Sequence, residues 1–365
     1  MIDQVYYQVD GIKTQSRNEA MILAGGDISR IYFYFMDDTW KTVDWNIEPI
    51  ESFDILCEKR CRQLREKFDW VCVWTSGGYD TQTVLESFIR SGARIDEIAF
   101  MDRKDYYDDP EIPIILENAV FYQKYHNSNL KISPIKIDYD YTDKFYQRLK
   151  SDWVLSPGVS FRFSKSTASY VHQFSDHLNK IKSNTQGRRV DIYGKEKALL
   201  DLRDGQWYMI MIDLAITDNM NTTTEYFFIT PDLPELHVKQ CYLAMQWFEQ
   251  RSDLSHEFVH HVQSHVAEHY QSWNLGMGRK QTRCSKSVDA LTKRYFLQND
   301  KSFESKKLLN HAVAEKRNSY NLYQQGVLDL RRVLGDGFKQ GVKSKEWYIR
   351  PCRSTHPNYK SLIFW

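Results

Sequence analysis

Apolar residues recur along the chain in two rhythms, one typical of helices and one typical of strands. From residue 52 they return every three or four positions, which predicts a helix with Ser52 as its N-cap. The first fifty residues instead contain short alternating runs, such as residues 31–36 and 41–45. We expect these runs to be strands of a small N-terminal β region.

Between residues 70 and 193, short apolar runs alternate with helical stripes. Strands are predicted at 70–74, 95–101, 132–137 and 189–193, and helices at 80–90, 113–125, 141–153 and 165–181. This order predicts an α/β fold in which a parallel, twisted sheet carries helices on both faces. Residues 206–212 are a further candidate strand, residues 217–224 a polar loop, and the chain is mostly helical beyond His237.

These patterns divide the 365 residues into a small N-terminal β region (1–51), an α/β domain (52–235) and a mainly helical C-terminal region (236–365). The content of 42% hydrophobic and 14% aromatic residues excludes a disordered chain. The sequence opens with polar residues, contains no apolar run of membrane-spanning length, and has six cysteines without a CxxC pair. We therefore expect a cytoplasmic protein without a membrane partner.

Charge is spread unevenly, although the net charge is only +1. Residues 271–365 contain 19 Lys and Arg against 7 Asp and Glu, so that the rest of the chain is acidic. A basic segment of this kind is typical of contact with the phosphates of a nucleotide or a nucleic acid. Alternatively, it is a solvated surface that pairs with the acidic part of the same chain.

A glycine-containing loop between the first predicted strand of the α/β domain and its helix is the main candidate for chemistry. Glycines have no Cβ, so backbone N–H groups can converge there on phosphate oxygens. The following helix adds its free N–H groups and the positive end of its dipole. Ser76 and Thr81 can donate hydroxyl hydrogen bonds, and Asp80 is a hard oxygen ligand for Mg²⁺. The predicted phosphate loop comprises Ser76, Gly77, Gly78, Tyr79, Asp80 and Thr81; the alternative is a plain Gly-Gly turn.

At this loop the chain resembles a known family. Residues 73–81 are similar to the SGGxD[S/T] signature of the PP-loop ATP pyrophosphatases, most of all to the synthetase domain of asparagine synthetase. The resemblance implies an adenine nucleotide α-hydrolase-like fold that uses ATP and Mg²⁺. It also implies that the loop holds the β and γ phosphates, which leave as pyrophosphate. A substrate oxygen attacks the α phosphate to give an adenylate, and an amine then displaces AMP.

The family's second loop has the form G-x-D-E, and the corresponding residues here are Gly194, Lys195, Glu196 and Lys197. The resemblance implies that Gly194 belongs to the nucleotide site and that Glu196 holds the metal, whereas Lys197 departs from the pattern. Lysines at the end of a parallel strand can stabilise the charge that builds up as the α–β bond breaks. Lys195, Glu196 and Lys197 are therefore predicted to be catalytic; alternatively, both lysines are exposed turn residues.

Adenine recognition is predicted at the carboxyl end of the second strand of the sheet. Phe100, Met101 and Asp102 lie there and are candidate neighbours of the base. The alternative is that they are ordinary core and loop residues.

A second motif competes with the phosphate loop. Residues 256–260 form an HExxH sequence, in which His256 and His260 share a helix face and could bind Zn²⁺, with Glu257 as general base. The third ligand is missing from its usual place, because Val266 stands ten residues after His256.

The sequence thus predicts an ATP-dependent, AMP-forming ligase that adenylates a carboxylate or a base oxygen for attack by an amine or ammonia. Met1 is followed by Ile2 and not by a catalytic cysteine, so we expect no glutaminase domain. The acceptor is a small molecule or a nucleobase, and a nucleic acid would contact the basic C-terminal region. The alternatives are a non-catalytic nucleotide-binding protein with the same fold, because the second loop is altered, and a zinc metallopeptidase.

Overall fold

The structure is a computed structural model that describes residues 5–14, 17–102, 111–136, 187–194, 198–212, 224–262, 266 and 344–353. Its centre is a five-stranded sheet with the order β10-β7-β4-β5-β6, in which all neighbouring strands are parallel. The strands are β4 (Trp70–Trp74), β5 (Glu97–Asp102), β6 (Lys131–Lys136), β7 (Arg189–Tyr193) and β10 (Thr224–Tyr226). The predicted α/β class with a parallel sheet is confirmed.

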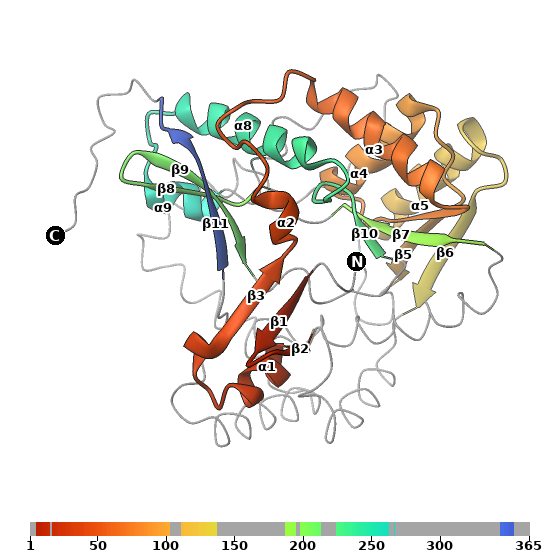
Figure 1. Ribbon diagram of the computed structural model, residues 1–365. Helices are drawn as coiled ribbons and strands as arrows, with labels where there is room; N and C mark the ends of the chain where they lie inside the picture. The colour runs from red at the N-terminus through yellow and green to blue at the C-terminus, as the bar shows by residue number, and fades with distance from the viewer. Residues whose placement is uncertain are drawn as a thin grey trace, which may run out of the picture.

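Helices α3 (Phe53–Lys67), α4 (Tyr79–Ser91) and α5 (Glu111–Tyr125) pack against one face of this sheet (Figure 1). The Ser52 side chain accepts a hydrogen bond from the Ile55 amide and caps α3, as predicted. Helix α4 ends at Gly92, which has a φ of 71° that favours glycine. The helices predicted at 141–153 and 165–181 lie outside the described residues.

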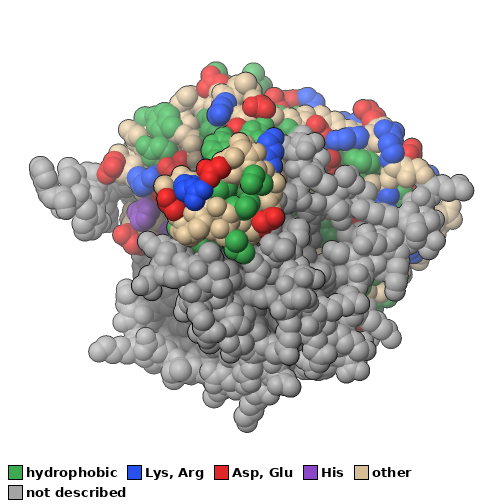
Figure 2. Space-filling view, turned by 60° about the horizontal axis from the view of Figure 1, so that its bottom comes forward, with side chains coloured by type: hydrophobic (Ala, Val, Ile, Leu, Met, Phe, Trp, Pro, Cys, Tyr) green, Lys and Arg blue, Asp and Glu red, His purple; other side chains and the backbone are tan. Residues whose placement is uncertain are grey.

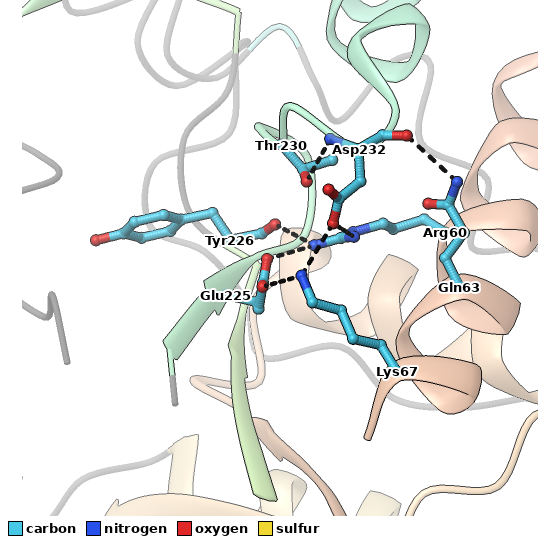
Figure 3. Close-up of polar contacts among 7 residues, drawn as sticks. All are labelled: Arg60, Gln63, Lys67, Glu225, Tyr226, Thr230 and Asp232. Atoms are coloured by element: carbon cyan, nitrogen blue, oxygen red, sulfur yellow. Dashed lines mark hydrogen bonds and ion pairs between the residues drawn. The ribbon is translucent and has the colours of Figure 1, made fainter. Parts of the chain in front are cut away.

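Helix α3 is tied to the edge strand β10 by a group of charged side chains (Figure 3). The fully buried Arg60 guanidinium donates to Glu225 at 2.8 Å and lies 3.4 Å from Asp232. Lys67, two helical turns further along the same face of α3, contacts the same two carboxylates at 3.1 and 3.2 Å. The cations of the first helix of the domain therefore hold its last strand and the turn that follows.

The N-terminal region is a three-stranded antiparallel sheet with the order β2-β1-β3. Its elements are β1 (Val5–Val9), β2 (Ile12–Thr14), α1 (Arg17–Leu23), η2 (Ile28–Arg30), β3 (Ile31–Phe35) and α2 (Asp37–Trp40). The predicted strand at 31–36 is confirmed as β3, but the prediction of a strand at 41–45 is wrong. Those residues form turns, because Trp40 and Trp45 fold back into one buried cluster in which the Trp45 indole donates to the Trp40 carbonyl.

A second antiparallel sheet has the strand order β11-β9-β8. Two of its strands, β8 and β9, lie between β7 and β10 in the sequence. Strands β8 (Leu200–Arg203) and β9 (Gln206–Ile212) form a hairpin whose turn residues Asp204 and Gly205 both have positive φ. The third strand, β11 (Ser344–Pro351), returns from the C-terminal part of the chain and pairs with β9 along its length. Strand β9 was predicted, whereas β8, β10 and β11 were not.

Helix α8 (Pro234–Glu249) begins with a proline in its first turn and packs on α3. Helix α9 (His256–Val262) lies against β8. The predicted domain boundary at 235/236 falls inside α8; the three-region division stays a prediction. Across the described residues, none of the helices combines the length and apolar character that a membrane crossing requires.

On the face drawn in Figure 2, the described residues carry both signs of charge. In Figure 2, Lys and Arg side chains alternate with Asp and Glu, and histidines emerge on the side of the molecule where α9 lies. Of the basic segment 271–365, the structure describes only residues 344–353, so the contact of this segment with phosphates stays a prediction.

Candidate functional site

The order of the parallel strands creates a switch point between β4 and β7. From β4 the chain continues to β5 on one side, whereas β7 lies on the other side of β4. In open α/β sheets, ligands bind outside the carboxyl ends of the strands at such a point. The loop that follows β4 is the predicted phosphate loop, and the residue that follows β7 is Gly194.

The phosphate loop has a backbone suited to an anion. Gly77 adopts a φ of 72°, which a side chain would strain, and Gly78 is extended as the N-cap of α4. Gly78 provides no side-chain cap for the first-turn N–H groups of α4. Ser76 is exposed and Asp80 is partly exposed. The arrangement can hold an anion at the positive end of the helix.

Two threonine hydroxyls brace this loop from within. The Thr75 Oγ1 accepts a hydrogen bond from the Gly77 amide at 3.0 Å and lies 3.1 Å from the Thr81 Oγ1. The Thr81 hydroxyl donates to the Gly78 carbonyl at 3.0 Å. The hydrogen of Thr81, which was predicted to reach a phosphate, is therefore used inside the loop. The role of Thr75 was missed, and its only sequence signal is a hydroxyl directly before the loop.

Gly194 comes very close to the phosphate loop. A Cβ built on this residue would lie 3.1 Å from the Asp80 carbonyl oxygen and 3.2 Å from the Thr81 amide nitrogen. A side chain at this position would require the first turn of α4 to shift by a few tenths of an ångström, so a glycine suits the close approach of β7 and α4. The structure thus brings Gly194 together with the phosphate loop. Lys195, Glu196 and Lys197 lie outside the described residues, and their catalytic and metal-binding roles stay predictions.

A layer of polar and aromatic side chains supports the site on the sheet face opposite α3, α4 and α5. Trp74 stacks on Tyr193 with the ring centroids 5.8 Å apart, and its indole donates to Asp191 at 2.9 Å. The Arg189 guanidinium bridges Asp191 at 2.9 Å and Glu97 at 2.7 Å. These residues are all buried. Sequence reasoning missed this layer, because charged residues inside a strand gave no sign of their partners.

The Glu97 carboxylate of this layer is held in its ionised form. Burial alone would raise the pKa of Glu97, but the Ser133 hydrogen bond and the positive charges of Arg189 and Lys131 outweigh it and lower that pKa. Burial also raises the pKa of Tyr193, whose hydroxyl stays protonated at neutral pH. Glu97 and Arg189 therefore keep their charges over the physiological pH range.

The predicted adenine neighbours are divided between core and surface. Phe100 is 1% exposed and packs with Ile112 and Ile115 of α5. Asp102 is partly exposed at the end of β5. Of Met101 only the backbone is described. The environment of Phe100 agrees with the alternative of an ordinary core residue, and the contacts of all three with adenine stay predictions.

The HExxH motif lies on the short helix α9. The His256 Nδ1 is 2.9 Å from Asp201 and 3.1 Å from the Leu202 carbonyl of β8, and its ring stacks near that of His260. Among the residues that the structure describes, no group of three or more His, Cys, Asp or Glu side chains could hold a metal ion. The motif joins α9 to the antiparallel sheet, and zinc catalysis stays an alternative prediction.

The cysteines of the described segments are free thiols. Cys57, Cys61, Cys72 and Cys241 are buried, and Cys352 is partly exposed. Burial raises the pKa of each of the four buried thiols, which keeps them protonated. These four residues are part of the core and are poor nucleophiles.

No protein-family model and no curated protein matches the chain. Among solved structures, it is similar in part to an NMN synthetase from Francisella tularensis, with 14% sequence identity and a TM-score of 0.27 over 39% of this chain and 54% of that one. An NH3-dependent NAD synthetase from Campylobacter jejuni subsp. jejuni gives 16% identity and a TM-score of 0.27 over 40% and 58%. An NAD+ synthetase from Burkholderia pseudomallei gives 10% identity and a TM-score of 0.28 over 70% and 92%.

The chain thus spans little more than half the length of the first two of these structures. Likenesses at TM-scores of 0.27 and 0.28 carry no argument about activity. The phosphate loop and the strand order of the sheet are the features of the chain that bear on its function.

Proposed function

We propose that the protein is an ATP-dependent, AMP-forming ligase whose phosphate loop grips the β and γ phosphates of ATP. One observation carries the proposal: the glycine loop leads from β4 into α4 at the switch point of the parallel sheet, where Gly194 closes against it. This is the place where an open α/β sheet binds a ligand, and the backbone there suits an anion. The likeness of residues 73–81 to the PP-loop signature supplies the reaction class.

Different residues of the two loops would bind pyrophosphate, hold the metal and stabilise the developing charge. Backbone N–H groups of the first turn of α4 and the exposed Ser76 hydroxyl would bind the leaving pyrophosphate. Asp80 stands in that turn with its side chain partly exposed, and a carboxylate in this place fits Mg²⁺, which would neutralise phosphate charge. Lys195 and Lys197 would stabilise the charge that develops as the α–β bond breaks, and Glu196 would assist in holding the metal.

The acceptor in this proposal is a carboxylate or a nucleobase oxygen, as in an asparagine-synthetase-like reaction. The oxygen attacks the α phosphorus, pyrophosphate leaves with its electron pair, and an amine or ammonia then displaces AMP from the adenylate. A nucleic-acid acceptor would engage the basic segment of residues 271–365. A cytoplasmic location belongs to the same proposal.

Labelled ATP tests the reaction class. With ATP labelled at the α phosphate, Mg²⁺ and a panel of carboxylates, nucleosides and RNA, we expect labelled AMP and equimolar pyrophosphate. Asp80→Asn should reduce pyrophosphate release by about 100-fold or more. The matched control is Glu66→Gln, an exposed carboxylate on α3 whose loss should change nothing. Formation of ADP in place of AMP would contradict the proposal.

The second candidate is a nucleotide-binding protein without catalysis. It is favoured by Lys197, which stands where the related signature has an acid. In that case ATP would bind with Asp80-dependent affinity but would be recovered intact with every acceptor. Restoring the acid in Lys197→Glu and finding pyrophosphate release would then show that the second loop had lost the chemistry.

A further inference from the structure

The two buried hydroxyls beneath the phosphate loop have only one consistent hydrogen-bond direction. The Gly78 carbonyl can only accept, so Thr81 spends its single hydroxyl hydrogen on that 3.0 Å bond. In the 3.1 Å contact between the two threonines, Thr75 must then be the donor. Thr75 in turn accepts from the Gly77 amide at 3.0 Å. The order is Gly77 N–H to Thr75, Thr75 to Thr81, and Thr81 to the Gly78 carbonyl.

This chain of three bonds, which we call the hydroxyl relay, encloses the residues that would meet an anion. It starts at the Gly77 amide and ends at the Gly78 carbonyl, so it fixes both glycines of the loop. Thr75 and Thr81 are 8% and 7% exposed, and water therefore competes little for their hydroxyls. Thr75 is itself held at the sheet end, because its amide donates to the Ala99 carbonyl at 2.9 Å.

The relay also separates the hydroxyls of the loop into two kinds. The hydrogens of Thr75 and Thr81 are directed into the protein. Ser76, in contrast, is exposed and is the hydroxyl residue of the loop that solvent can reach. A loop whose N–H groups are fixed before a ligand arrives binds more tightly than one that must be ordered at that moment.

We propose that Thr75 is a positioning residue, whose hydroxyl holds the phosphate loop in its anion-binding conformation and leaves Ser76 to contact the ligand. The inference rests on the proposed function for its ligand, which is the pyrophosphate group of ATP or free pyrophosphate. The relay itself is a property of the unliganded loop and can be measured without any ligand.

The first arm of the test measures the relay. The chain has 16 glycines, so selective ¹⁵N-glycine labelling gives a small set of amide signals whose hydrogen exchange can be followed. Thr75→Val keeps the shape of the side chain but removes the hydroxyl, and we expect the Gly77 amide to exchange about 10-fold faster or more. Thr75→Ser keeps the hydroxyl and should preserve the protection. Thr75→Ala replaces the valine variant if the latter does not fold.

The second arm measures binding of Mg²⁺-pyrophosphate and of a non-hydrolysable ATP analogue by calorimetry. Thr75→Val removes both hydrogen bonds of the Thr75 hydroxyl and should weaken binding of both ligands by about 10-fold, whereas Thr75→Ser should stay within about 2-fold of the parent chain. Ser76→Ala should weaken binding without changing the exchange of Gly77. A merely structural role would lower the melting temperature of Thr75→Val and leave the affinity of the folded fraction unchanged.

The outcomes separate this inference from the proposed function. If the parent chain binds neither ligand, the proposed function fails, while the exchange arm still decides whether the relay exists. If the parent chain binds and Thr75→Val binds equally well, or if its Gly77 amide keeps full protection, the positioning role of Thr75 is overturned.

Discussion

The two faces of the parallel sheet are made by the same strands and are buried to the same extent, but they differ in chemistry. On the face covered by α3, α4 and α5, the side chains of Val71, Val73, Val190 and Ile192 are fully buried among apolar neighbours. On the opposite face the alternate residues of the same strands include Asp191 and Glu97, which are equally buried. The face toward α3, α4 and α5 is an apolar core. The opposite face combines buried ion pairs with apolar residues that belong to a second core cluster.

The difference shows where this fold depends on directional hydrogen bonds in addition to apolar burial. Apolar contacts stabilise the sheet in proportion to area but do not select one alignment of the strand ends. Hydrogen bonds from Arg189 and Trp74 to Asp191 do select one, because they have fixed directions. The Trp74 bond is made by the strand residue directly before Thr75 and the phosphate loop. The apolar face instead packs against helices α3, α4 and α5, where burial alone is sufficient.

Breaking the polar layer should have the largest effect on stability. Arg189→Met would leave Glu97 and Asp191 buried without their main partner, and we expect the free energy of unfolding to fall by about 3–5 kcal/mol in urea denaturation. Lys131→Met is the control, because Lys131 contacts Glu97 from an exposed position and should cost less than about 1 kcal/mol. Equal losses in the two variants would show that the layer is not held by Arg189.

The core that covers the polar face also contains an ionisable group, and its titration should be the next largest effect. Burial lowers the pKa of His237 to about 4, so the folded protein keeps the imidazole neutral while the unfolded chain takes up a proton below pH 6.5. Stability should therefore fall by about 2 kcal/mol as the pH drops from 6.5 to 4.5. His237→Phe should flatten this dependence in urea melts at the two pH values; an unchanged slope would contradict the assignment.

The charged cluster at the edge of the helix-covered face should be less sensitive than the layer at the centre of the other face. Arg60→Met removes one cation from Glu225, but Lys67 stays within 3.1 Å of that carboxylate (Figure 3). We expect a loss of about 1–3 kcal/mol in urea denaturation. The double variant Arg60→Met, Lys67→Met should lose more than the sum of the two single losses, and simple additivity would refute this backup role.

The smallest effect is expected from a small cavity on the apolar face. Ile192→Val removes one buried methylene group, which should cost about 1 kcal/mol in the same assay. Its neighbour in sequence, Asp191, points to the other face, so Asp191→Asn serves as a paired comparison within one strand. A larger loss for Ile192→Val than for Asp191→Asn would reverse the ranking of the two faces.

The elements that could be predicted from the sequence are those with a strong local pattern. The strands at 70–74, 189–193 and 206–212 match β4, β7 and β9 residue for residue. Strand β4 and most of β9 are apolar runs, and in β7 apolar residues alternate with charged ones. Strands β8 and β11 were missed. β8 has only four residues, two of them charged, and β11 becomes a strand through its pairing with β9, which is far away in sequence.

The backbone of the candidate site could be predicted from the sequence, but the side-chain hydrogen bonds that hold it could not. Gly77 and Gly78 can be identified directly in the sequence, and their position at the end of the sheet follows from the strand that precedes them. The relay through Thr75 depends on a turn of the backbone that brings the Gly77 amide back to the threonine hydroxyl two residues earlier. The Trp74–Asp191 bond depends on β4 and β7 being neighbours, a pairing that local sequence does not reveal.

Strand β11 has a consequence for the order in which the protein is made. Its partner β9 is synthesised early, and Ser344 pairs with Ile212 only after all the intervening residues have left the ribosome. At the usual rates of translation this delay is on the order of ten seconds. During that time one edge of the hairpin offers unpaired N–H and C=O groups to any other strand in the cell. The nascent chain therefore carries an open β edge through much of its synthesis, and we expect chaperone occupancy to be highest just before β11 emerges.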